Sequence, residues 1–402
     1  MGLTDYWWTN DWDFNILKSH MKRMLIAFSL FMVLASKVFA GEWDIRKLTD
    51  NMTFDRTPQI DGNGNVAWLG YDSNYSLSEM FLYKWGDQSI NRLGNGYSEI
   101  RSYGLSFNGN VAWSDSTGVF LYDGEMTKKI SPARGNDVGV NSSRDVVWSA
   151  SGLSWSDIYI YHEGKVLNLP NYADKTRNDY QVKISDSGKV VWKGDAIGKY
   201  RVTASNIFQY NYISGNYKMV GTYWGKYSGL SDINSQGQVV FVCGDEQNGY
   251  NIFLDDGFNI IKLTSTPYYG NQPEVKISGN NVVWVSGEKI FLYDGKQVLQ
   301  IADNFQRGVS ISGNLIVWEG QGADDSAVFL YDNGSVKELA YGTEPDVFGN
   351  AITWAGFDGN DWEIYKAMPR DLTVTPEPAS MILFGVGGAA IAALRWRKKA
   401  SA

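Results

Sequence analysis

The sequence predicts an all-β fold built from about eight repeated four-stranded units, with seven as the alternative count. The composition is 44% hydrophobic and 14% aromatic with only 20% charged residues, which excludes a disordered chain. Its 43 glycines favour many tight turns. The third observation is an internal repeat. Residues 277–304 and 311–342 both read Ile-Ser-Gly-Asn, then an apolar triplet ending in Trp, then Phe-Leu-Tyr-Asp.

The apolar triplet predicts one strand of each unit, because short apolar runs between turn signals are typical of buried strands. A further strand follows it, as at 81–83 or 329–331, and usually ends in Asp-Gly or Asn-Gly, as at 123–124 and 333–334. Such dipeptides form two-residue hairpin turns, so each unit is an antiparallel meander. The triplet ends in an aromatic residue eight times along the chain, at Trp68, Trp113, Trp148, Trp192, Phe241, Trp284, Trp318 and Trp354.

Four-stranded units that recur about every 40 residues and stack on their neighbours are typical of a β-propeller. The last unit runs from Tyr365 into a Pro-containing segment and lacks its outer strand, whereas residues 45–48 provide one at the other end. We therefore predict a propeller over residues 41–370 whose ring is closed by an N-terminal strand. The repeat is irregular between Trp192 and Phe241, where the fourth blade is poorly defined.

The pattern "PEVKISGNNVVW…IFLYDG…VLQIADN", starting at Pro273, resembles the blades of TolB-like propellers. The resemblance covers roughly residues 41–370. It rests on the order of strands and turns and includes no catalytic motif.

The N-terminal region predicts export. Residues 21–40 have two basic residues, an apolar stretch and a small-residue cleavage site between Ala40 and Gly41, as a signal peptide does. Residues 1–20 have no place in such a signal, so they are a mis-assigned start or an extension, with Met1 and Met21 as the two alternative starts.

The C-terminal segment 371–402 combines three ordered elements. Pro376, Glu377 and Pro378 precede an apolar run at 379–394, which is short for a membrane helix at ~1.5 Å per residue. Arg395, Arg397, Lys398 and Lys399 follow and would stay cytoplasmic, with the body outside. One interpretation of this segment is a single-span membrane anchor.

These three elements resemble the PEP-CTERM sorting signal of exported bacterial proteins. The resemblance implies recognition by an exosortase-type membrane enzyme in Gram-negative bacteria that make extracellular polysaccharide. Delivery to the cell envelope, outer surface or extracellular matrix follows from it.

The body offers little chemistry. Between residues 41 and 378 the formal net charge is about −13, which disfavours nucleic acid and anionic lipid as partners. The lone Cys243 forms no internal disulfide, and His162 lies in a hairpin where an exposed turn residue is expected. The acidic pairs at 245–246, 255–256 and 324–325 lie where turns are expected, so we interpret them as solvated turn acids.

We expect no cofactor and no metal site. The stretches "DGNGN" at 61–65 and "DGND" at 358–361 alternate oxygen ligands, but the first lacks the Gly and Glu of a calcium loop. Aromatic residues outside the repeat core are candidate platforms for stacking sugar rings. They are Trp85, Trp155, Trp224 and Trp362.

The sequence therefore predicts an exported propeller that is not an enzyme and that acts as a binding or structural module, with extracellular polysaccharide or an envelope protein as partner. The alternative is a polysaccharide lyase or glycoside hydrolase of exopolysaccharide metabolism.

Overall fold

The computed structural model describes residues 43–370 apart from 95, 97, 152–155, 171–175, 198–201, 222–226, 246, 270–271 and 323–324. Residues Ile45–Ala367 form one compact unit. The other unit comprises Met1–Asp44 and Met368–Ala402, most of which lies outside the described residues. Within the described part, no helix is long and apolar enough to cross a membrane.

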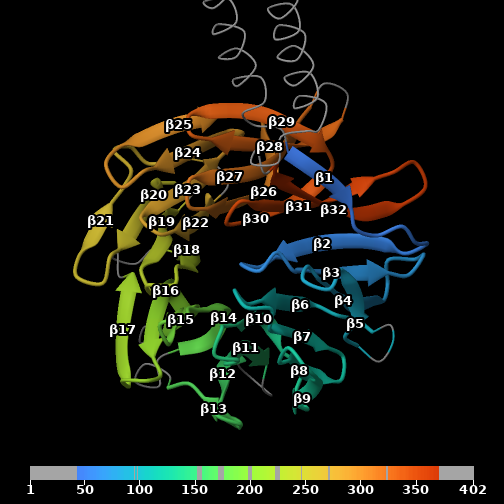
Figure 1. The fold of residues 1–402 in the computed structure, drawn as a ribbon. Coiled ribbons are helices and arrows are strands. Elements are labelled where there is room, and N and C mark those ends of the chain that lie inside the picture. The colour runs from blue at the N-terminus through green and yellow to red at the C-terminus, as the bar shows by residue number, and fades with distance from the viewer. Residues whose placement is uncertain are drawn as a thin grey trace, which may run out of the picture. The chain divides into compact units, whose positions relative to one another are not determined.

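The described residues form eight four-stranded blades that follow one another around a ring, as Figure 1 shows. This confirms the predicted all-β propeller with eight blades. Blades 3 and 4 are further joined by one parallel pair, Ser156 with Asn178.

Blades 1 to 4 each have four strands, including the fourth blade, whose repeat is irregular in the sequence. Their strands are β2 (Phe54–Ile60), β3 (Val66–Tyr71), β4 (Ser78–Lys84) and β5 (Ser89–Arg92); β6 (Ser102–Leu105), β7 (Val111–Asp115), β8 (Gly118–Tyr122) and β9 (Thr127–Ser131); β10 (Asn136–Val140), β11 (Val146–Ser151), β12 (Ser156–His162) and β13 (Lys165–Asn168); β14 (Thr176–Ile184), β15 (Lys189–Ile197), β16 (Val202–Asn211) and β17 (Asn216–Gly221).

Blades 5 to 8 complete the ring. Their strands are β18 (Tyr227–Ile233), β19 (Val239–Asp245), β20 (Gly249–Asp255) and β21 (Ile260–Lys262); β22 (Glu274–Ser278), β23 (Asn281–Ser286), β24 (Lys289–Tyr293) and β25 (Val298–Ala302); β26 (Phe305–Ser312), β27 (Leu315–Gln321), β28 (Ser326–Asp332) and β29 (Ser335–Tyr341); β30 (Thr343–Phe348), β31 (Ala351–Phe357), β32 (Trp362–Pro369) and β1 (Trp43–Lys47).

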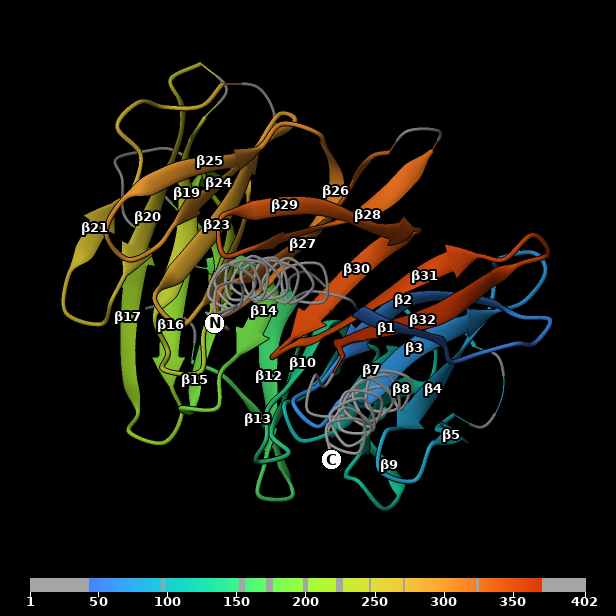
Figure 2. The same cartoon turned by 45° about the horizontal axis from the view of Figure 1, so that its top comes forward.

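The N-terminal strand closes the ring as predicted. β1 is the outer strand of blade 8 and pairs with β32 (Figure 2). Just after it, the Leu48 N–H donates to the Ile364 carbonyl at 2.7 Å, and the Ile364 N–H donates to Thr49 Oγ1 at 2.8 Å. The two ends of the propeller are thus held together by the pairing of β1 with β32 and by these hydrogen bonds, so the facing edges of both strands are covered.

The repeated aromatic residues form the core of every blade. The aromatic residue that ends the triplet on the second strand lies directly opposite a Phe or Tyr of the third strand, as Trp284 lies opposite Phe291. In seven blades the two rings are stacked, with interplanar angles of 12–16°. In blade 4 the rings of Trp192 and Phe208 are tilted by 33°. Burial of these pairs is the main reason that a sheet of four short strands is stable.

Candidate functional site: the central channel

The first strand of each blade lines the propeller axis, and each contacts the first strands of both neighbouring blades. Figure 1 shows these eight strands around the centre, and they are β2, β6, β10, β14, β18, β22, β26 and β30. Side chains that alternate along them point either into the blade or into the channel.

One residue of each first strand occupies the same place. It lies in register with the residue that precedes the core aromatic residue, as Lys276 does with Val283 and Asp346 with Thr353. All eight are half-buried. We call this set the channel ring, and it consists of Gln59, Gly104, Gly139, Lys183, Asp232, Lys276, Ser310 and Asp346.

Three side chains of the channel ring bind the backbone of the next blade. Gln59 Oε1 accepts the Leu105 N–H at 3.0 Å. In the same way, Asp232 Oδ2 accepts the N–H of Ile277 at 3.0 Å. Asp346 Oδ2 accepts the Ile60 N–H, also at 3.0 Å, and so links blade 8 to blade 1. In each case the donor is the residue that follows the ring position of the next blade. These hydrogen bonds therefore connect neighbouring blades.

Polar side chains two residues before the ring positions form a second level of hydrogen bonds between neighbouring blades. Ser102 Oγ accepts the Val138 N–H, Asp137 Oδ2 accepts the Gln181 N–H and Glu344 Oε2 accepts the Thr57 N–H, each at 2.8 Å. Several residues at this level have positive φ at β-bulges, which re-aim their side chains. They are Thr57, Asp137, Gln181 and Glu344.

The charges of the ring balance one another. Lys183 Nζ lies 3.0 Å from Asp232 Oδ1, and this carboxylate raises the pKa of the lysine. Burial alone would raise the pKa of Asp232, but Lys183, Lys276 and the bound N–H hold it below its ordinary value. Burial raises the pKa of Asp346, whose Oδ1 accepts a hydrogen bond from Ser310 Oγ at 2.7 Å.

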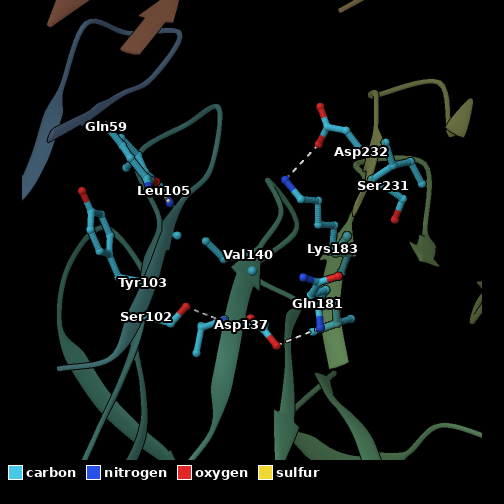
Figure 3. Close-up of a pocket in the computed structure, with 16 residues that line it drawn as sticks. Gln59, Ser102, Tyr103, Leu105, Asp137, Val140, Gln181, Lys183, Ser231 and Asp232 are labelled. Carbon is cyan, nitrogen blue, oxygen red and sulfur yellow. Dashed lines mark hydrogen bonds and ion pairs between the residues drawn. The ribbon is translucent and has the colours of Figure 1, made fainter. Parts of the chain in front are cut away.

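A cavity of about 490 Å³ opens in the channel beside the first strands of blades 1 to 5. Figure 3 shows Gln59 and Leu105 on one side of it and Lys183 and Asp232 on the other, with Val140 between them. Its wall is mostly polar side chains and backbone, so it is suited to a hydrogen-bonding ligand and not to an apolar one.

Two of the predicted sugar platforms lie against cations. Lys366 Nζ lies 3.6 Å from the centre of the Trp85 ring, and the guanidinium carbon of Arg56 lies 4.5 Å from that of Trp362. Both tryptophans are half-buried. Trp155 and Trp224 lie outside the described residues. A cation on a ring face is a cation–π contact, so each described ring has one face less for a sugar.

Asp50, Asp358 and Glu363 bring carboxylate oxygens within 4.8 Å of one another where the ring closes. Lys47 Nζ stands among them, 2.7 Å from Asp50, 2.6 Å from Asp358 and 3.5 Å from Glu363. The lysine thereby supplies the positive charge that such a cluster needs. In the other acidic turn, Asp61 Oδ1 accepts the N–H groups of both Asn63 and Asn65.

Two expectations about single residues were wrong. His162 is half-buried and not an exposed turn residue, because its Nδ1 lies 2.8 Å from Asp145 Oδ1, and Tyr212 donates to the other oxygen of that carboxylate. Asp255 is buried and not solvated, because it forms an ion pair with Lys218 Nζ at 2.5 Å. The contacts of Tyr212 with Asp145 and of Lys218 with Asp255 cross between blades, which a single strand pattern does not reveal.

The sorting elements at 376–399 and the cleavage site at Ala40 and Gly41 lie outside the described residues. A family model described as the PEP-CTERM protein-sorting motif matches residues 374–398. The chain ends in a PEP-CTERM sorting motif. This motif implies an exported protein that is processed by an exosortase at the cell envelope.

A search of curated proteins finds no significant match. Among solved structures, the Dos1 propeller is 12% identical, with a TM-score of 0.56 over 83% of this chain and 97% of that chain. Oligogalacturonate lyase from Vibrio parahaemolyticus is 10% identical, with a TM-score of 0.50 over 82% and 97%. TolB from Acinetobacter baumannii is 11% identical, with a TM-score of 0.41 over 77% and 65%. At such identities the likeness to the first two structures shows the fold alone.

The channel ring was not predicted from the sequence. Its one visible signal is the middle residue of a triplet on the first strand that is usually apolar-x-apolar, as in Val275-Lys276-Ile277 or Val182-Lys183-Ile184. That residue is Gln, Gly, Lys, Asp or Ser in the different blades, so the position carries no repeated motif. Its partners come from the neighbouring blade and become visible only in the folded ring.

Proposed function

We propose that this chain is an exported propeller that is not an enzyme and that acts as a binding or structural module at the outer surface or in the extracellular matrix of a Gram-negative bacterium. Its partner is an extracellular polysaccharide or an envelope protein. The signal peptide at 21–40 exports it, cleavage separates Ala40 from Gly41, and the C-terminal motif directs its sorting. Within that motif Pro376, Glu377 and Pro378 are recognised, and Arg395, Arg397, Lys398 and Lys399 orient the apolar segment at 379–394.

One observation carries the choice of a binding module. The carboxylates of the channel hold neighbouring blades together: Asp232 binds Lys183 and the Ile277 N–H, and Asp346 binds the Ile60 N–H. A carboxylate that acts as general acid or base must exchange its proton with a substrate. Groups engaged in the wall of the channel suit a rigid receptor better than a reacting centre.

The second candidate is an enzyme of exopolysaccharide metabolism. Oligogalacturonate lyase shares the propeller fold with this chain, and Asp137 and Lys183 both face the same cavity here. A lyase or hydrolase would use such groups as base and acid.

A turnover assay against exopolysaccharide from the producing bacterium separates the two candidates. We expect neither new reducing ends nor unsaturated sugars after prolonged incubation with the full chain, while the same polysaccharide is retained by the immobilised protein. Release of either product, abolished by Asp137→Asn, would establish the enzyme instead.

A further inference from the structure

Three consecutive positions of the channel ring beside the cavity offer no acceptor to the next blade. Gly104 and Gly139 have no side chain to offer to the next blade, and the Lys183 ammonium has no acceptor atom. The N–H groups of Val140, Ile184 and Ile233 occupy the place that the N–H of Leu105 occupies in blade 2, where Gln59 accepts it. They therefore have no ring side chain as partner.

Strand pairing shows where these N–H groups point. In each blade the residue after the donor bonds across the first hairpin: Asn141 N–H to Asp145 O at 3.1 Å, Ser185 N–H to Lys189 O at 2.9 Å. Because hydrogen-bonded and non-bonded pairs alternate in an antiparallel ladder, the preceding N–H points away from its own sheet. Val140, Ile184 and Ile233 all line the cavity. Three backbone donors from consecutive blades thus face it.

The same cavity holds acceptors without partners among the described residues. Gln181 Oε1 and Ser231 Oγ are buried and have no hydrogen-bond partner, and both residues line the cavity. Both hydrogen bonds of Asp137 end on Oδ2, from the Gln181 N–H at 2.8 Å and Ser149 Oγ at 3.1 Å. Buried polar groups are nearly always hydrogen-bonded in native proteins, so these groups are available to bind water or a polar ligand in the cavity.

The mixture of groups defines the ligand class. The cavity wall contains both donors and acceptors, and each hydroxyl of a sugar both donates and accepts. Lys183 is already paired with Asp232, and Asp137 leaves the cavity slightly acidic, so a carboxylate ligand would meet like charge. The volume of about 490 Å³ lies within the ~300–1,000 Å³ of ordinary ligand sites.

We propose that this part of the channel binds an uncharged sugar unit through the N–H groups of Val140 and Ile184 and the side chains of Gln181 and Ser231. This inference rests on the proposed function and names the ligand of its binding site. The two glycines are essential because any side chain there covers the donors: a Cβ on Gly139 would lie 3.8 Å from Ile184 N.

The test uses the full chain in a detergent without a sugar headgroup. Saturation-transfer difference NMR is recorded with glucose, galactose and N-acetylglucosamine as neutral probes and with glucuronate as the acidic one. We expect at least one neutral probe to bind and glucuronate to bind at least about tenfold more weakly, because Asp137 repels it. No signal from any neutral sugar at ~100 mM, or stronger binding of glucuronate, would overturn the proposal.

The variants locate the site. Gly139→Asn supplies the acceptor that Gln59 and Asp232 provide in their blades, so it should bind the Ile184 N–H and weaken sugar binding at least about tenfold with little change in Tm. Ser231→Ala should also weaken binding, and it serves if Gly139→Asn does not fold. Ser310→Ala is the matched control, because this ring residue does not line the cavity.

Binding that survives both Gly139→Asn and Ser231→Ala would place the sugar elsewhere and refute the inference. The turnover assay tests the non-enzymatic function, and the binding experiment tests the sugar site. Sugar binding with no product supports both proposals, product formation contradicts only the non-enzymatic function, and absence of binding contradicts only the sugar site.

Discussion

Lys366 provides a quantitative test of how blades 8 and 1 are joined. This lysine on β32 is almost fully buried, with 1% exposure, and its Nζ donates to the Gly64 carbonyl at 2.6 Å while lying on the Trp85 ring. Burial lowers its pKa from 10.5 to about 8, and Asp61 opposes that change. The ammonium is therefore destabilised in the fold relative to the unfolded chain.

The sign of the pH dependence follows from linkage. Between about pH 8 and about pH 10.5 the unfolded chain binds a proton that the folded protein has lost, so stability rises with pH in this window. The full gap corresponds to about 3 kcal/mol at ~1.4 kcal/mol per pKa unit. Between about pH 7 and about pH 9.5 the expected gain is about 2 kcal/mol.

Lys366→Met retains the apolar stem and removes the titrating group. The free energy of unfolding, measured in urea at several pH values across this range, should rise with pH by about 2 kcal/mol more in the wild type than in the variant. The exposed Lys289→Met is the control and should follow the wild-type profile. Parallel profiles for wild type and Lys366→Met would refute the reasoning. A wild type that loses stability with pH relative to the variant would show that Trp85 and Gly64 outweigh desolvation.

Two further perturbations test the interblade contacts. Asp232→Asn removes the charge that faces Lys183, so we expect it to lower the free energy of unfolding by ~1–3 kcal/mol. The loss should exceed that caused by Ser310→Ala. An equal or smaller loss would contradict the role of Asp232 in connecting neighbouring blades. Lys47 holds the pKa of Asp358 at about 2, below its ordinary 3.8, so the closure contributes stability that is lost as pH falls through this range. Lys47→Met should shift acid unfolding, followed by circular dichroism, to higher pH, and an unchanged midpoint would show that the ion pair contributes little.

The strand pattern of the propeller was predictable because it is local. The triplet that ends in Trp284 and the partner strand with Phe291 lie within ten residues of each other, and their alternation alone indicates a buried antiparallel pair. Closure by residues 45–48 was also predictable, since one missing strand at one end matched one extra strand at the other. The fourth blade follows the same pairing although its sequence is irregular.

The candidate site was not predictable for the opposite reason. Gln59 and Asp232 both accept a backbone N–H of the next blade, although they are different residues in different blades. The donors are more than 40 positions away in the sequence. A glycine such as Gly139 is informative only when its neighbours in the ring are known. Lys366 likewise belongs to no motif in the sequence, and only its packing against Trp85 in the structure shows that it is buried.

The central claim is that this propeller is exported and sorted through its two ends. The intact mass of the mature protein isolated from its own host tests it most directly. We predict a chain that begins at Gly41 and ends near Pro378, without the segment 379–402. A mature mass that retains the C-terminal segment would contradict sorting and would indicate a propeller held by an ordinary membrane anchor.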